Sequence, residues 1–108
     1  MGRLKTPEIT DDITVLEKTI AEMMQVSPIR SMDPNVLFDA MTRMPFTTEL
    51  VFDKIFGRWI FSNEDEDDWS KVMDGHKVSG PNFTFVERSP EMAIIKGIHY
   101  YYHTRIKQ

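Results

Sequence analysis

Residues 92–108 read MAIIKGIHYYYHTRIKQ, and this C-terminal stretch decides the fold that the sequence predicts. Side chains alternate between the two faces of a β-strand, so positions of equal parity share a face. The even positions are apolar or aromatic: Met92, Ile94, Ile98, Tyr100, Tyr102 and Ile106. The odd positions from 99 onward carry cations and rings: His99, Tyr101, His103, Arg105 and Lys107. This alternation predicts a final strand with one core face and one basic, aromatic surface face.

The segment before this stretch also alternates. Residues 82–88 place Phe83 and Phe85 on one face of a strand and Thr84 and Val86 on the other. Residues 89–91 (Ser-Pro-Glu) supply turn chemistry, because proline suits the second position of a turn. The two segments together predict an antiparallel hairpin at the C-terminus.

Helical patterns fill the first half of the chain. Residues 11–25 carry apolar side chains at helical spacing, and capping residues precede them at positions 10–12. A second helix is predicted from Asp33 and Pro34, a good cap followed by a good first residue, and Pro45 stops it. Residues 48–56 show a third helical stripe, although valine and phenylalanine at positions 51 and 52 also favour a strand.

Shorter segments complete the prediction. Residues 58–61 indicate a strand, residues 63–75 a helix with an acidic first turn, and residues 76–81 a loop. The predicted fold class is α+β, with three to four N-terminal helices packed on a small C-terminal antiparallel sheet or hairpin. The length of 108 residues indicates a single domain over residues 1–108, in which residues 1–9 are a loose lead-in.

Composition excludes several classes of site. The chain has no cysteine, which rules out disulfides, thiolate nucleophiles and cysteine-ligated metals and fits a reducing compartment. No apolar run approaches the length of a membrane span, and the first residues lack the apolar core of a signal peptide. We therefore expect a cytoplasmic chain without a membrane partner.

Methionine and acidic side chains are the predicted protein-binding features. Methionine is common on adaptable binding surfaces, and five of the eight methionines fall in the first two helices and their linker. The predicted interaction residues are Met24, Met41 and Met44, together with the acidic run Glu64, Asp65, Glu66, Asp67 and Asp68. These features predict a small, non-enzymatic regulatory protein, an inhibitor or adaptor, that binds and modulates a protein partner.

The alternative function is nucleic-acid or nucleotide binding through the basic, aromatic face of the last strand. Rings stack on bases and cations contact phosphates, which assigns the binding to His99, Tyr101, His103, Arg105 and Lys107. The formal net charge of −4 weighs against this alternative. A homodimer through an apolar helix face or a sheet edge is also consistent with the sequence.

Metal and catalytic motifs are weak. His99 and His103 lie four residues apart and would share a metal with His76 or a carboxylate, but the spacing lacks the glutamate of the zinc-protease motif. The acidic run lacks the central glycine and final glutamate of a calcium loop. No nucleophile elbow or glycine-rich phosphate loop is present. The sequence therefore predicts no catalytic residue, no metal and no cofactor.

Overall fold

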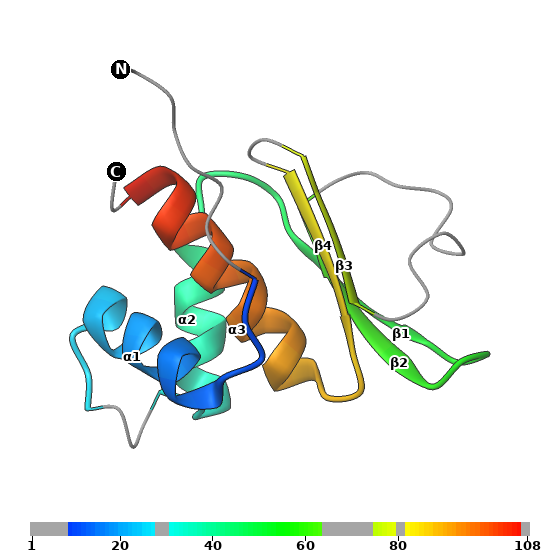
Figure 1. The fold of residues 1–108 in the computed structure, drawn as a ribbon, viewed down its shortest axis with the longest axis horizontal. Helices are drawn as coiled ribbons and strands as arrows, with labels where there is room; N and C mark the ends of the chain where they lie inside the picture. The colour runs from blue at the N-terminus through cyan, green and yellow to red at the C-terminus, as the bar shows by residue number, and fades with distance from the viewer. Residues whose placement is uncertain (1–8, 28–30, 64–74, 80–81, 107–108) are drawn as a thin grey trace.

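The computed structural model describes residues 9–27, 31–63, 75–79 and 82–106 of the chain. Helices and strands are interleaved along these residues (Figure 1). In chain order they are α1 (Ile13–Met24), α2 (Pro34–Thr42), β1 (Glu49–Asp53), β2 (Arg58–Ser62), β3 (Gly75–Ser79), β4 (Asn82–Glu87), α3 (Pro90–Tyr101) and a π-helical turn, η3 (Tyr102–Ile106).

The strands form one antiparallel sheet in the order β1-β2-β4-β3. Phe61 in β2 lies opposite Phe85 in β4, and Ile60 lies opposite Val86. Because side chains alternate along a strand, Phe61 and Phe85 share one face while Ile60 and Val86 share the other. The first pair belongs to the main core and the second forms a small separate cluster. The predicted division of faces along residues 82–88 is confirmed.

Helix α3 is the central layer of the molecule. It packs on β2 and β4, while α1 and α2 pack against α3 and lie on the far side from the sheet (Figure 1). Every residue of α3 from Ala93 to Tyr101 is buried, as expected for a helix that is covered on all sides. The main core joins side chains of all three helices to the sheet, including Leu16, Ile20, Leu37, Ala40, Phe61, Phe83, Phe85, Ile94, Ile95 and Ile98.

The predicted C-terminal strand is wrong, because residues 90–101 form a helix. The side chain of Ser89 accepts a hydrogen bond from the backbone N–H of Met92 at 3.1 Å, which caps the helix, and Pro90 occupies its first turn. These residues start a helix rather than a turn. A helix buried on all sides lacks the polar face that reveals a helical period, so the apolar residues at its even positions also fit one face of a strand.

The two N-terminal helices are confirmed, and aspartate caps both. Asp12 accepts a hydrogen bond from the N–H of Thr14 at 3.0 Å, and Asp33 accepts one from Asn35 at 2.9 Å. Pro34 follows the second cap in the first turn of α2, as predicted. The strand predicted at residues 58–61 is present as β2.

Two other segments differ from the prediction. The helix over residues 48–56 is wrong, and the competing strand is right, since Glu49–Asp53 is β1. The loop predicted at residues 76–81 contains most of β3, which pairs with β4 from Gly75 to Ser79. Residues 64–74, which make up most of the helix predicted over residues 63–75, lie outside the described residues. The α+β class is therefore confirmed, but the order of helices followed by a C-terminal sheet is wrong.

The helices of the described residues are short. None of them combines the length and the apolar composition that are needed to cross a membrane.

Candidate functional site

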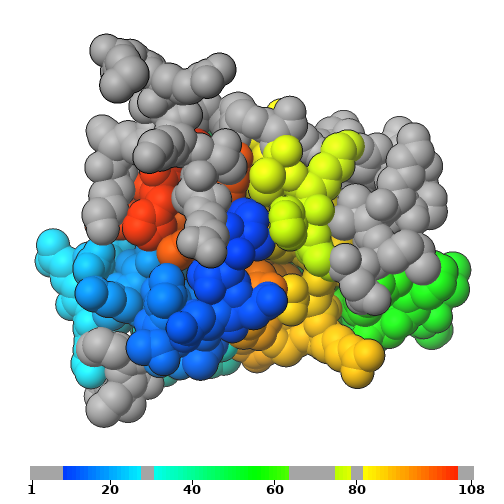
Figure 2. All heavy atoms as spheres, viewed as in Figure 1, coloured from blue at the N-terminus to red at the C-terminus, as the bar shows by residue number. Residues whose placement is uncertain are grey.

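Exposed apolar side chains gather on the hairpin that joins β1 to β2. Of the seven large apolar side chains exposed among the described residues, four belong to this hairpin: Val51, Phe52, Ile55 and Phe56. Ile55 retains 86% of its accessible surface, and the two phenylalanines retain about half of theirs (49% and 51%). We call these four residues the hairpin patch. The hairpin, coloured green, extends away from the helices in Figures 1 and 2.

The turn that carries the hairpin patch is well bonded. Oδ1 of Asp53 accepts the backbone N–H groups of Ile55 at 3.0 Å and Phe56 at 3.5 Å. The carbonyl of Asp53 accepts the N–H of Gly57 at 2.8 Å, and Gly57 has a φ of 66°, a conformation that suits glycine. An aspartate that bonds the next backbone amides is a common turn device. These hydrogen bonds fix the turn in a conformation that leaves Ile55 and Phe56 exposed.

Two side-chain contacts support the hairpin patch from β2. The rings of Phe52 and Trp59 lie 5.0 Å apart between centroids. The guanidinium of Arg58 lies 4.9 Å from the centroid of the Phe56 ring, within the range of a cation–π contact. Each phenylalanine ring is thus held by a side chain of β2, while about half of its surface stays exposed to solvent.

A second feature is a polar cluster that joins α1 to α3 and η3. The hydroxyl oxygen of Thr19 lies 2.8 Å from Nδ1 of His99 and 3.2 Å from Nε2 of His103. It also contacts the carbonyl of Val15 at 3.2 Å. A hydroxyl has one hydrogen and two acceptor positions, and a carbonyl only accepts. All three contacts are satisfied when the hydroxyl donates to Val15 and both imidazole nitrogens donate to the hydroxyl oxygen.

This cluster is closed rather than open to a substrate. Thr19 and His99 are buried and His103 is half-buried, while the two imidazole rings lie 4.4 Å apart between centroids. A hydroxyl that is buried and bonded on three sides is not presented to an incoming molecule. The arrangement fastens α1 to the last turn of α3 and to the start of η3, with the Thr19 hydroxyl enclosed between them.

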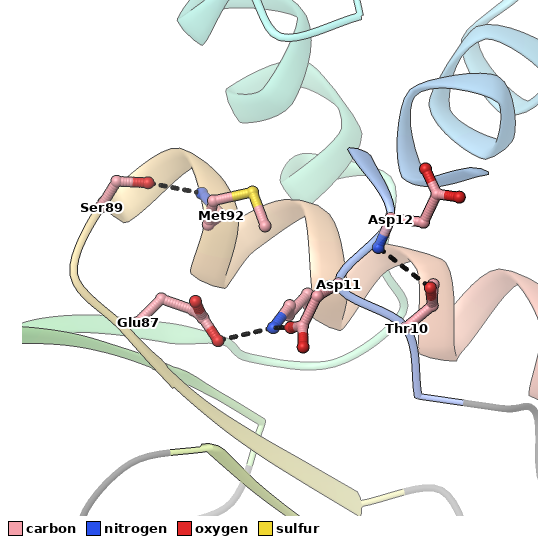
Figure 3. Close-up of polar contacts among 7 residues, drawn as sticks. Thr10, Asp11, Asp12, Glu87, Ser89 and Met92 are labelled. Carbon is pink, nitrogen blue, oxygen red and sulfur yellow. Dashed lines mark hydrogen bonds and ion pairs between the residues drawn. The ribbon is translucent and has the colours of Figure 1, made fainter. Parts of the chain in front are cut away.

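A third cluster surrounds the buried ammonium of Lys96 in α3. It forms ion pairs with Glu87 at 2.7 Å and with Asp11. Figure 3 shows Glu87 and Asp11 pointing toward one another from the end of β4 and from the segment before α1. In that segment the Thr10 hydroxyl accepts the N–H of Asp12 at 3.0 Å (Figure 3). The cluster therefore connects three elements of the fold.

The charges of this cluster stabilise one another. The hydrogen bond from Lys96, followed by its positive charge, lowers the pKa of Asp11 below 3.8. Burial alone would lower the pKa of Lys96, but hydrogen bonds and charge from Asp11 and Glu87 outweigh burial and raise that pKa above 10.5. A lysine whose pKa is raised stays protonated, so Lys96 is a structural cation rather than a base.

The structure places the methionine residues that the sequence assigned to an interface in or against the main core. Met24 and Met44 are buried in the main core, and Met41 is half-buried against it. The acidic residues 64–68 lie outside the described residues. Within the part of the chain that the structure describes, the three methionines therefore contribute to the packing of the core.

The residues of the nucleic-acid hypothesis do not share a strand face. His99 and Tyr101 are buried in α3, and His103 is half-buried in η3. The backbone of Arg105 belongs to η3, and Lys107 lies outside the described residues. The basic, aromatic face required a strand, and the helix disperses its members around the helix axis. His99 and His103 do lie close together, but both rings contact the buried hydroxyl of Thr19.

The metal hypothesis has little geometric support. Across the described ranges, no three histidine, aspartate or glutamate side chains are grouped closely enough to hold a metal ion. His76 lies on β3 beside the ring of Phe85, with 6.0 Å between ring centroids. It is thus separate from the pair formed by His99 and His103.

The hairpin patch was not predicted from the sequence. Three of its residues, Phe52, Ile55 and Phe56, were predicted to lie on the apolar stripe of a helix over residues 48–56. The signal that would have located it is Asp53 followed four residues later by Gly57, a spacing typical of a hairpin turn. Comparisons with protein-family models, with curated proteins and with solved structures gave no match.

Proposed function

We propose that this chain binds a protein partner through the hairpin patch. The observation that carries this proposal is the concentration of exposed apolar side chains on one hairpin, with Ile55 and Phe56 on its bonded turn and two more on the strand before it. Exposed apolar groups that cluster together are typical of interaction sites, because their burial against a partner is favourable. Aromatic side chains such as Phe52 and Phe56 are frequent anchors in such interfaces.

Protein binding is also the function that the sequence suggested, but the surface proposed for it is now the hairpin patch rather than the methionines. Met24 and Met44 are buried in the main core, which leaves little of their surface for contact with a partner. The hairpin supplies it instead, at an end of the molecule where a partner would not disturb the packing of α3. The turn is bonded through Asp53 and Gly57, which limits the conformational entropy that binding costs.

The test compares variants of the hairpin patch with a matched apolar control. The tagged chain, the double variant Ile55→Asp/Phe56→Asp and the variant Phe38→Asp are used to capture proteins from a lysate of the source cells. Phe38 is as exposed as Phe56 but lies in α2, so it controls for the loss of an exposed phenylalanine. Circular dichroism establishes that all three fold.

We expect a protein that the unaltered chain and Phe38→Asp retain and that the double variant loses. Titration of that purified protein should then show at least about a ten-fold weaker affinity for the double variant, equivalent to about 1.4 kcal/mol. Equal capture by all three chains would contradict the proposed function.

A further inference from the structure

Strand β1 is an edge of the sheet. In the order β1-β2-β4-β3, all five residues of β1 pair with β2 on one side. Within residues 9–27, 31–63, 75–79 and 82–106, no strand pairs with its other side. An edge of this kind presents backbone N–H and C=O groups that can pair with an added strand. Val51 and Phe52 of the hairpin patch belong to this edge strand, and the other two patch residues follow in the turn.

The two edges of the sheet differ in their side chains. The opposite edge, β3, exposes His76 and Lys77 near its centre, and lysine on an edge strand discourages the addition of another strand. The centre of β1 instead carries Val51 and Phe52, both exposed. The distribution of apolar side chains therefore favours β1 as the edge that accepts a strand.

The charges on β1 distinguish between two occupants. Glu49, Val51 and Asp53 lie on one face of the sheet, because side chains alternate and these residues pair with Ser62, Ile60 and Arg58. If a second copy paired antiparallel about Val51, Glu49 would lie opposite Asp53 of that copy. Like charges directly opposite one another are destabilising. A foreign strand with a cation opposite each carboxylate would instead be favoured.

We propose that β1 accepts an extended segment of a partner protein as a fifth strand of the sheet. The segment carries lysine or arginine opposite Glu49 and Asp53 and an apolar residue opposite Val51. This inference rests on the proposed function, since the hairpin patch supplies the apolar anchor and β1 supplies the sequence preference. Main-chain hydrogen bonds provide affinity in strand addition, and alternate side chains provide specificity.

The experiment uses two labelled synthetic peptides as probes. The first has the sequence threonine, lysine, valine, isoleucine, valine, lysine and threonine, and the second replaces both lysines with glutamate. Fluorescence anisotropy should show that the unaltered chain binds the lysine peptide about ten-fold more tightly, because two attractive charge pairs replace two repulsive ones. The variant Glu49→Lys should reduce or reverse this preference, whereas Lys77→Glu on β3 should leave it unchanged.

NMR spectroscopy locates the bound peptide. Changes in backbone amide shifts caused by the lysine peptide should concentrate in β1 rather than in β3. Failure of both peptides to bind, equal binding of the two, or a preference that depends on Lys77 would overturn strand addition at β1. A dimer of the unaltered chain that Val51→Lys dissociates would assign β1 to a second copy and would also overturn it.

The outcomes separate this inference from the proposed function. Loss of the captured protein in Ile55→Asp/Phe56→Asp, with no discrimination between the peptides, would retain the hairpin interface and reject strand addition. A peptide preference that Glu49→Lys removes, with capture that is insensitive to the hairpin patch, would retain strand addition and reject the patch as the anchor.

Discussion

Gly97 in α3 approaches the ring of Phe61 in β2 so closely that a β-carbon at position 97 would lie 2.4 Å from the ring atom Cδ2. It would also lie 2.8 Å from the ring of Phe83. The absence of a side chain at this one position therefore sets the distance between the central helix and the sheet. The same packing determines how the hairpin is held relative to the helices, since Phe61 belongs to β2.

We expect Gly97→Ala to lower the free energy of unfolding by about 1–3 kcal/mol, the usual cost of overpacking a core. Alanine would improve helix propensity by about 1 kcal/mol, but the two rings that it meets are both fully buried and have little room to move. Urea unfolding followed by circular dichroism measures the difference.

A double variant provides the control for this prediction. Phe61→Leu alone should be destabilising, but combined with Gly97→Ala it should cost less than the sum of the two single changes, because the smaller side chain relieves the contact. An unchanged or raised stability of Gly97→Ala would contradict the close packing of Gly97 against Phe61.

The sequence predicted the elements whose ends carry strong local signals. The capping residues at positions 10–12 and Asp33 marked the starts of α1 and α2, because capping is a property of a few adjacent residues. Ser89 and Pro90 carry an equivalent signal for α3, but next to the alternation that follows they were assigned to a turn. A helix packed between a sheet and two other helices has no polar face, so its sequence lacks the period that identifies most helices.

The candidate site was harder to predict than the fold class. Residues 48–56 carry apolar side chains at both helical and strand spacing, and only the pairing of β1 with β2 decides between them. Exposure of Ile55 follows from that pairing, because the strand ends at Asp53 and the turn projects the next residues outward. The approach of His99 to Thr19 joins residues 80 positions apart, which no local pattern contains.

The two carboxylates that bind Lys96 should differ in their contribution to stability. The side chain of Glu87 is 21% exposed and that of Asp11 is 89% exposed. Glu87→Gln should therefore lower the free energy of unfolding by about 1–3 kcal/mol, as for a hydrogen bond to a buried charge. Asp11→Asn should cost less than about 1 kcal/mol, since exposed ion pairs contribute little. Thermal unfolding at neutral pH compares them, and a larger loss in Asp11→Asn would contradict the assignment.

The contribution of Asp11 should depend on pH. Its pKa is lowered in the folded state from 3.8, so its stabilising effect is present above 3.8 and is lost as the pH falls through the folded value. The stability difference between the unaltered chain and Asp11→Asn should therefore shrink on acidification. Urea titrations at neutral pH and below 3.8 measure it. Asp39→Asn, which removes an exposed carboxylate from α2 and leaves Lys96 untouched, is the matched control.

Lys96 should give the opposite dependence at alkaline pH. Its folded pKa is raised above 10.5, so the stability that it contributes is complete below 10.5 and is lost as the pH rises through the folded value. The difference between the unaltered chain and Lys96→Met should decrease over that alkaline range. A difference that grows with pH would contradict the direction of the shift.

Thr19→Val should destabilise the chain by about 1–3 kcal/mol, because it removes the hydroxyl that contacts both His99 and His103 while keeping the shape of the side chain. Thr19→Ser retains the hydroxyl and should cost less. Nitrogen-detected NMR measures the chemical shifts of the imidazole nitrogens, which report on their hydrogen bonds rather than on packing alone. It should show a proton on Nδ1 of His99 in the unaltered chain and a changed environment of that nitrogen in Thr19→Val, but not in Thr19→Ser.

Ile55 should be dispensable for folding, in contrast to the core residues. It is 86% exposed, so Ile55→Asp should change the free energy of unfolding by no more than about 0.5 kcal/mol, as is usual for surface substitutions. Phe61→Ala, also in the hairpin but fully buried, should cost about 3–5 kcal/mol. Urea unfolding of both variants checks this contrast. A residue of an interface should be needed for binding but not for folding. A large loss of stability in Ile55→Asp would instead assign Ile55 to the fold itself and remove the basis for the hairpin patch.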